Sequence, residues 1–237
     1  MSRITYKEPG VMKEEGTMFG LSGSVASYGN TLMKGEGRLS FGTMDYTGAD
    51  WDGTPLSING IDDVMLELRG LVGKNLLGGE ENKILQASYL YLYAGLGYRY
   101  LDDDSSTFDG GYERESNYFY IPIGIEAGKD MDNGWNVRGT LEYDLFLMGV
   151  QTSYLSDADP GYNDLTNIQD RGYGYRFSLS LKKQSNKTVF VIGPFVRYWN
   201  INESEEEDIT YYGIWEGTGV EPKNNSTEIG IQIGLGF

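Results

Sequence analysis

Residues 226–237 read STEIGIQIGLGF and alternate strictly between apolar and polar or glycine positions. Successive side chains of a β-strand point to opposite faces, so a period of two collects the apolar residues on one face. The apolar positions are Ile229, Ile231, Ile233, Leu235 and Phe237. This stretch predicts an amphipathic final strand that closes on an aromatic residue.

The same period of two recurs along the chain and predicts an all-β fold in one domain, residues 1–237. Long connections at 45–61, 102–116, 154–172 and 202–225 alternate with shorter ones, which places the long loops at one end of a closed sheet. For that alternation to hold, a strand must precede residues 17–28, and only residues 4–12 can supply it, despite Pro9. The predicted strands are 4–12, 17–28, 33–44, 64–73, 88–101, 118–127, 135–147, 173–182, 189–200 and 226–237. We therefore expect a closed antiparallel up-and-down barrel of ten strands, or of eight if the N-terminal hairpin is irregular.

An amphipathic last strand that ends on Phe resembles the final strand of small Gram-negative outer-membrane β-barrels. The resemblance implies that the apolar faces meet lipid and that the polar faces line the lumen. It also implies a monomer at the cell surface, with outer-membrane lipid and lipopolysaccharide as partners and recognition of the last strand by the barrel-assembly machinery. Because Met1 leads straight into the polar segment SRITYKEPG, we expect a signal sequence to have been removed ahead of it.

The polar faces of the predicted strands carry both signs of charge. An Arg and Glu mixture of this kind favours a paired network in a narrow lumen over a solvated sheet face. The expected lumen network comprises Lys34, Glu36, Arg38, Glu67, Arg69, Arg99, Glu126, Arg138, Glu142, Asp144, Arg176 and Arg197. Within it, we expect the carboxylates of Glu142 and Asp144 to form salt bridges with Arg138 and Arg176.

Composition excludes several function classes. A net charge of −16 disfavours nucleic acid as a partner, since a phosphate-binding protein requires a basic face. The chain has no His and no Cys, whereas the known barrel enzymes, such as the omptin proteases and outer-membrane phospholipases, rely on a His. We therefore expect a protein that is not an enzyme and holds no organic cofactor.

The four long loops are strongly acidic, with Arg114, Arg171 and Lys223 as their only cations. Clustered carboxylates are ligands for hard divalent cations, which suggests a surface site for Ca²⁺ or Mg²⁺, although no loop has EF-hand spacing. The alternative is that the acidic loops are simply solvated. The candidate ligands are Asp102, Asp103, Asp104, Asp157 and Asp159.

Three functions fit these patterns. The first is a non-enzymatic outer-membrane barrel with a side-chain-filled lumen and a structural or surface-interaction role. The second is a narrow, porin-like channel for small solutes or ions. The third is a soluble β-barrel that binds an apolar ligand.

Overall fold

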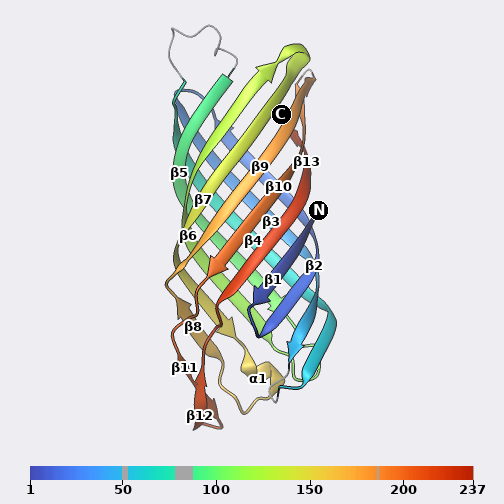
Figure 1. Cartoon of the computed structure of the whole chain (residues 1–237), viewed down its shortest axis with the longest axis vertical. Helices are drawn as coiled ribbons and strands as arrows, with labels where there is room; N and C mark the ends of the chain where they lie inside the picture. The colour runs from blue at the N-terminus through green and yellow to red at the C-terminus, as the bar shows by residue number, and fades with distance from the viewer. Residues whose placement is uncertain (50–52, 78–87, 186, 237) are drawn as a thin grey trace.

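The computed structural model describes residues 1–49, 53–77, 88–185 and 187–236, and it forms a closed antiparallel barrel of ten strands (Figure 1). The predicted strand number is confirmed. Each strand pairs with its neighbours in the chain, and β1 closes the ring by pairing with both β2 and β13. The barrel strands are β1 (Ser2–Glu8), β2 (Met12–Ser27), β3 (Thr31–Ala49), β4 (Pro55–Asn75), β5 (Ser88–Asp104), β6 (Glu113–Met131), β7 (Trp135–Ser153), β9 (Gly172–Ser185), β10 (Thr188–Ile201) and β13 (Asn224–Gly236).

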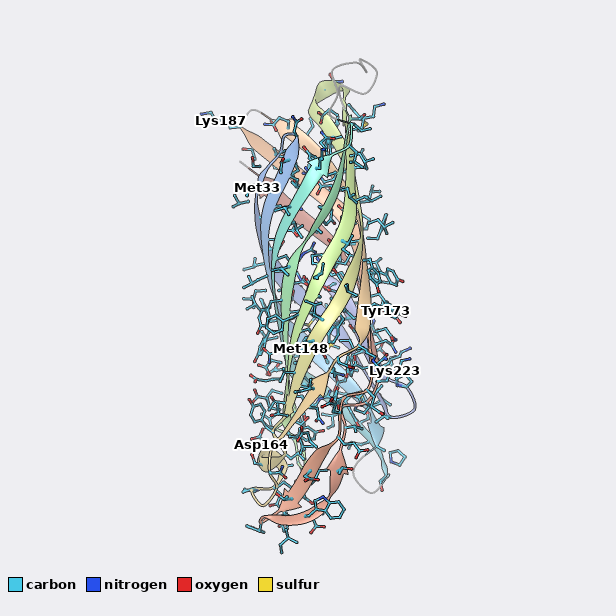
Figure 2. The ribbon with its side chains drawn as sticks, turned by 90° about the vertical axis from the view of Figure 1, so that its left-hand side faces the viewer. Met33, Met148, Asp164, Tyr173, Lys187 and Lys223 are labelled. Carbon is cyan, nitrogen blue, oxygen red and sulfur yellow. The ribbon has the colours of Figure 1, made fainter. Side chains whose placement is uncertain are left out.

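The two faces of the wall are opposite in character. Outward positions are aliphatic or aromatic along the middle of each strand, and many are strongly exposed, such as Val25 at 83% and Ile233 at 81%. Inward positions hold the buried charges, together with tyrosines and clusters of aliphatic residues. Figure 2 shows side chains projecting outward along the full height of the barrel. The alternation read from the sequence therefore maps onto an apolar exterior and a polar interior.

Several strands run much further than the sequence predicts. β3 continues to Ala49 and β4 begins at Pro55, both within the predicted loop 45–61. β5 continues to Asp104 and β6 begins at Glu113, so strands also occupy the two ends of the predicted loop 102–116. In these extensions the outward face is also polar, as at Asp45 and Asp62. The apolar period of two disappears there while the strand itself goes on, which is why the sequence predicts loops.

The N-terminal strand begins and ends earlier than predicted. β1 ends at Glu8, and the backbone N–H of Val11 donates to the Glu8 carbonyl at 2.9 Å, closing a tight turn through Pro9 and Gly10. Gly10 has a φ of 82°, a conformation that favours glycine. With seven residues β1 is the shortest barrel strand, and it pairs with β2 only as far as Met18.

The two remaining long connections contain structure of their own at the lower end of the barrel in Figure 1. α1 (Leu155–Ala158) and β8 (Leu165–Gln169) lie between β7 and β9, and β8 pairs with the end of β7. β11 (Glu207–Tyr211) and β12 (Ile214–Gly219) form a separate hairpin between β10 and β13. The opposite end carries the short turns, including η1 (Asp132–Gly134). Phe237 and most of the connection 74–87 lie outside the described residues.

Candidate functional site: the charged lumen

The middle of the lumen is organised around Arg176, which projects inward from β9 and is 6% exposed. Its Nε lies 2.6 Å from Asp144 Oδ2 and 3.2 Å from Glu142 Oε1, both on β7. Its Nη1 donates to Glu67 Oε2 at 2.8 Å, which crosses the lumen because β4 and β9 lie four strands apart in the ring. Its Nη2 donates to the Tyr120 hydroxyl at 2.9 Å. One arginine thus pairs with three buried carboxylates through charged hydrogen bonds, the strongest kind that side chains form.

Two further ion pairs cross the lumen near this network. Arg69 on β4 places its Nη2 2.5 Å from Glu142 Oε2 on β7. Arg38 on β3 donates to both oxygens of Glu228 on β13, at 2.7 and 2.8 Å, and Arg197 approaches the same carboxylate at 3.2 Å. Strands on opposite walls are therefore connected through their side chains as well as around the wall.

A second group of charges lies nearer the short-turn end. Arg138 Nε lies 3.3 Å from Glu126 Oε1, and the guanidinium donates to the hydroxyls of Tyr89 at 2.8 Å and Tyr28 at 2.7 Å. Lys34 Nζ lies 3.5 Å from the other oxygen of Glu126. This layer caps the central network with cations and aromatic rings.

The expected pairing of Arg138 with Glu142 or Asp144 is wrong, whereas the pairing of Arg176 with both is correct. Glu142 lies four residues from Arg138 along β7, and a strand rises about 3.3 Å per residue, so the two Cα atoms are about 13 Å apart. Side chains that share a strand face can be too distant to pair, and the partner comes from a neighbouring strand instead.

The opposite, loop-facing end contains a third group centred on Arg114 of β6. Its guanidinium binds Asp103, lies 3.1 Å from Glu8 Oε1 and lies 3.3 Å from Glu14 Oε1. Arg114 was expected on a surface loop, but β6 begins at Glu113 and turns its side chain into the barrel. The local balance is acidic, because one cation serves several carboxylates.

Burial of these carboxylates changes their proton affinity. Desolvation raises the pKa of Glu14 to about 8, against the opposing charge of Arg114 and with help from Asp103. Desolvation likewise raises the pKa of Glu221 to about 7, although Tyr6 donates a hydrogen bond to that carboxylate at 3.0 Å. The acidic end therefore exchanges protons near neutral pH.

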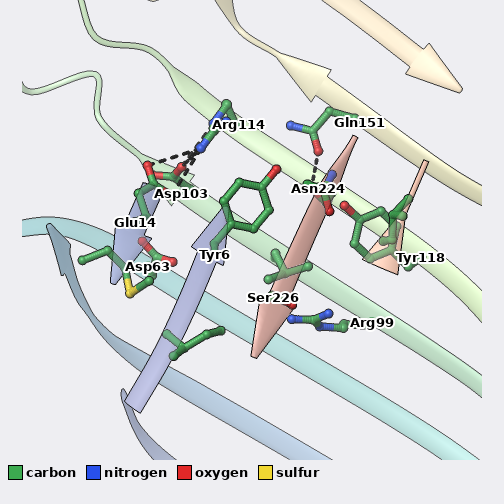
Figure 3. A pocket seen from close by; sticks show the side chains of 15 residues that line it. Tyr6, Glu14, Asp63, Arg99, Asp103, Arg114, Tyr118, Gln151, Asn224 and Ser226 are labelled. Atoms are coloured by element: carbon green, nitrogen blue, oxygen red, sulfur yellow. Dashed lines mark hydrogen bonds and ion pairs between the residues drawn. The ribbon is translucent and has the colours of Figure 1, made fainter. Parts of the chain in front are cut away.

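Between the acidic end and the central network lies a cavity of about 50 Å³. Figure 3 shows Arg99 beside Ser226 at one side of this pocket, and Glu14, Asp63 and Asp103 at the other. Arg99 is 4% exposed, and its Nε has no hydrogen-bond partner among the described residues.

No protein-family model matches this sequence, and no curated protein matches it either. In the described part of the chain, no helix is long and apolar enough to cross a membrane.

All twelve lumen residues predicted from the sequence lie on inward faces. Eleven of them take part in ion pairs, and Arg99 takes part in none among the described residues. The prediction omits Glu228, which accepts from two arginines, and the loop-end group around Arg114. In the strict alternation of the final strand, Glu228 falls on the polar face and Ile229 on the apolar face. The sequence alone is therefore sufficient to place Glu228 in the lumen network.

The five predicted metal ligands are not brought together. Asp103 faces the lumen, and Asp102 and Asp104 alternate to the other face of β5. Asp157 and Asp159, at α1, accept hydrogen bonds from backbone N–H groups at 3.2 and 2.8 Å. Over residues 1–49, 53–77, 88–185 and 187–236, no group of three or more Asp, Glu, His or Cys side chains is arranged to hold a metal ion.

Proposed function

We propose that the protein is a non-enzymatic barrel of the bacterial outer membrane, closed by its own side chains, with a structural or surface-interaction role carried by its acidic loop end. The observation that carries this proposal is that the apolar and charged faces are reversed relative to a soluble protein, with apolar side chains outside and charged side chains inside. Leu21 and Ile233 are 73% and 81% exposed on the outside, whereas Glu142 and Asp144 are at most 2% exposed inside. A soluble protein gains stability by burying apolar side chains, and this barrel instead presents them to its surroundings.

The height of the apolar exterior fits a bilayer. On β7 its alternating exposed residues extend from Trp135 to Leu147, twelve residue steps. At about 3.3 Å per residue and a strand tilt of about 40°, twelve steps rise about 30 Å, the thickness of the hydrocarbon core of a bilayer. Glu8, Glu14, Asp103 and Arg114 lie beyond this band, near the loop-facing ends of their strands.

Aromatic side chains mark one border of the band. Tyr143, Tyr173, Tyr175 and Tyr198 contact one another on the outer surface of three adjacent strands, and the rings of Tyr143 and Tyr173 stack at 6.4 Å. Rings with an apolar body and a polar tip favour the boundary between hydrocarbon and water. This arrangement supports an aromatic girdle on the loop-facing side.

The filled lumen favours a closed barrel over a channel. The cross-lumen pairs of Arg176, Arg69 and Arg38 occupy the space that a solute would have to cross. A ten-stranded barrel encloses little more than its own inward side chains.

A pair of arginine substitutions tests the membrane proposal. Leu141→Arg introduces a charge in the middle of the apolar band, and Thr47→Arg introduces one on the outward face of β3 beyond it. Both positions are exposed, so a soluble barrel would tolerate both. In a membrane barrel we expect Leu141→Arg to lower the free energy of unfolding by about 2–4 kcal/mol and Thr47→Arg to have little effect.

The measurement is denaturant unfolding of the chain refolded in detergent micelles, followed by the change in gel mobility on boiling. A chain that is folded and monodisperse in plain buffer, with both variants equally stable, would overturn the proposal and favour a soluble barrel.

A further inference from the structure

Arg99 is a buried cation that the described residues leave unpartnered. It lies opposite Glu67 of β4 in the strand register but forms no ion pair with it, and the centroid of the Trp199 ring lies 5.6 Å from its guanidinium carbon. Arginine remains protonated in proteins and carries five N–H donors. Leaving such a group buried without acceptors is strongly unfavourable, so its donors point to a bound molecule.

The cavity at Arg99 is large enough for such a molecule. A cavity needs a volume of roughly 10–15 Å³ to hold one water molecule. A cavity of about 50 Å³ therefore holds a few waters or a small organic molecule of similar size. The walls near Arg99 are polar and include Gln151, Asn224 and Ser226. They offer both donors and acceptors to a ligand group that binds the guanidinium.

The far side of the cavity is lined by carboxyl groups. Asp63, Glu14 and Asp103 line it with a single cation, Arg114. Asp63 Oδ1 is buried without a hydrogen-bond partner among the described residues, so this side holds an acceptor that lacks a donor.

The two sides are separated by an apolar middle. Arg99 and Asp103 both face inward from β5, four residues and therefore about 13 Å apart at their Cα atoms. Leu101, Ile4 and Met44 line the cavity as well. A ligand that satisfies both ends therefore needs an acceptor group, a short apolar chain and a donor group.

The two sides together narrow the ligand further. A simple anion bound to Arg99 would leave the buried oxygens around Asp63 without a donor, and a simple cation would leave Arg99 unpaired. We infer that this cavity binds a small zwitterion, an amino acid whose carboxylate accepts from Arg99 and whose ammonium group donates to the carboxyl oxygens around Asp63. This inference does not rest on the proposed membrane location, because it concerns the interior of the barrel alone.

Isothermal titration calorimetry of the full chain tests the inference with a graded series: glycine, β-alanine, 4-aminobutyrate and 6-aminohexanoate. Butyrate and butylamine, which each carry one of the two charges, serve as single-charge probes. We expect binding to depend on the separation of the two charges and to be at least about tenfold weaker for either single-charge probe, the factor that a hydrogen bond to a charged group contributes.

Two variants locate the site. Arg99→Gln should weaken binding of the best amino acid at least about tenfold and abolish its advantage over butylamine, and Asp63→Asn should abolish its advantage over butyrate. Arg171→Gln, at an exposed pair with Asp170, is the matched control. Thermal melts establish that each variant is folded, and Ser226→Ala offers a milder change in the same cavity if Arg99→Gln does not fold. Absence of binding throughout the series, or binding that Arg99→Gln, Asp63→Asn and Ser226→Ala leave unchanged, would overturn the inference.

Discussion

At the scale of single residues, the lumen depends on a few arginines that each serve several carboxylates. Arg176 contacts Glu67, Glu142 and Asp144, whereas Arg138 pairs with one carboxylate among the described residues, Glu126, which Lys34 also contacts. Removing one member of a buried ion pair leaves its partner charged in a poorly hydrated interior. The two arginines are therefore not equivalent in stability, although they look alike in the sequence.

Arg176→Leu should lower the free energy of unfolding by about 3–5 kcal/mol, because three buried carboxylates lose their shared cation. Arg138→Leu should cost less, since Lys34 still neutralises Glu126. Arg171→Leu changes an exposed side chain and should stay within about 0.5 kcal/mol of the parent. Denaturant midpoints with a common m-value compare the three, and equal midpoints for Arg176→Leu and Arg171→Leu would contradict the buried network.

The acidic end makes stability depend on pH in an unusual direction. The folded-state pKa of Glu14, about 8, exceeds its ordinary value of 4.5, so the folded chain binds the proton more tightly than the unfolded chain does. This contribution is fully present below about pH 4.5 and is lost as the pH rises through 8. The raised pKa of Glu221, about 7, acts in the same direction.

We therefore expect the barrel to unfold at a lower denaturant concentration at pH 8.5 than at pH 5.5. Glu14→Gln removes the contribution of Glu14 to this pH dependence. That contribution is on the order of 1.4 kcal/mol for each unit by which folding raises the pKa of Glu14. Glu15→Gln changes the outward-facing neighbour, whose pKa is lowered by Lys13 and Arg3, and should leave the slope above pH 5 unchanged. A parent protein that is more stable at pH 8.5 than at pH 5.5 would refute the assignment.

At the scale of elements, inward tyrosines on β5 and β6 lie over glycines of the adjacent strand. In the strand register, Tyr93 is paired with Gly124 and Tyr120 with Gly97. A Cβ on Gly97 would stand 2.1 Å from Tyr120 Cζ, and one on Gly124 would stand 2.6 Å from Tyr93 Cζ. Glycine allows each ring to lie against the wall, which leaves room in the lumen for the charged side chains.

Gly97→Ala should be destabilising by about 1–3 kcal/mol, because it displaces the Tyr120 ring and with it the hydroxyl that donates to Glu67. Gly70→Ala provides the control on the neighbouring strand β4, where an added Cβ meets nothing within 4 Å. Thermal or denaturant unfolding of the two variants checks this, and equal stabilities would show that the ring does not need the glycine.

The elements also show what the sequence can and cannot predict. Alternation identifies every barrel strand wherever one face is apolar, as in residues 135–147. It fails at Asp45 and Asp62, where both faces are polar and only backbone pairing maintains the strand. Pairing across the lumen is equally hidden, because which side chains meet depends on how the ring closes, as the positions of Arg138 and Glu228 illustrate.

At the scale of the whole molecule, the lumen has a gradient of charge along its axis. Cations predominate near the short turns, with Lys34, Arg138 and Lys182 around Glu126, and the central network mixes both signs in direct pairs. Carboxylates predominate at the loop-facing end around Arg114. The interior therefore has an electrostatic direction, even though its middle is closed by side chains.

A closed middle predicts that the barrel does not conduct. Planar bilayers that contain the protein should show no stable stepwise conductance, because the pairs of Arg176 and Arg69 span the lumen. A porin of known conductance, reconstituted in the same way, is the positive control. Reproducible steps at the nanosiemens scale would favour the channel alternative.

The shortness of β1 has a mechanical consequence. The ring closes through a strand of seven residues, whereas β4 has twenty-one, and β1 pairs with β13 only as far as Gly230. Force applied sideways to the wall would meet its fewest hydrogen bonds at this seam, so the barrel should unzip there first.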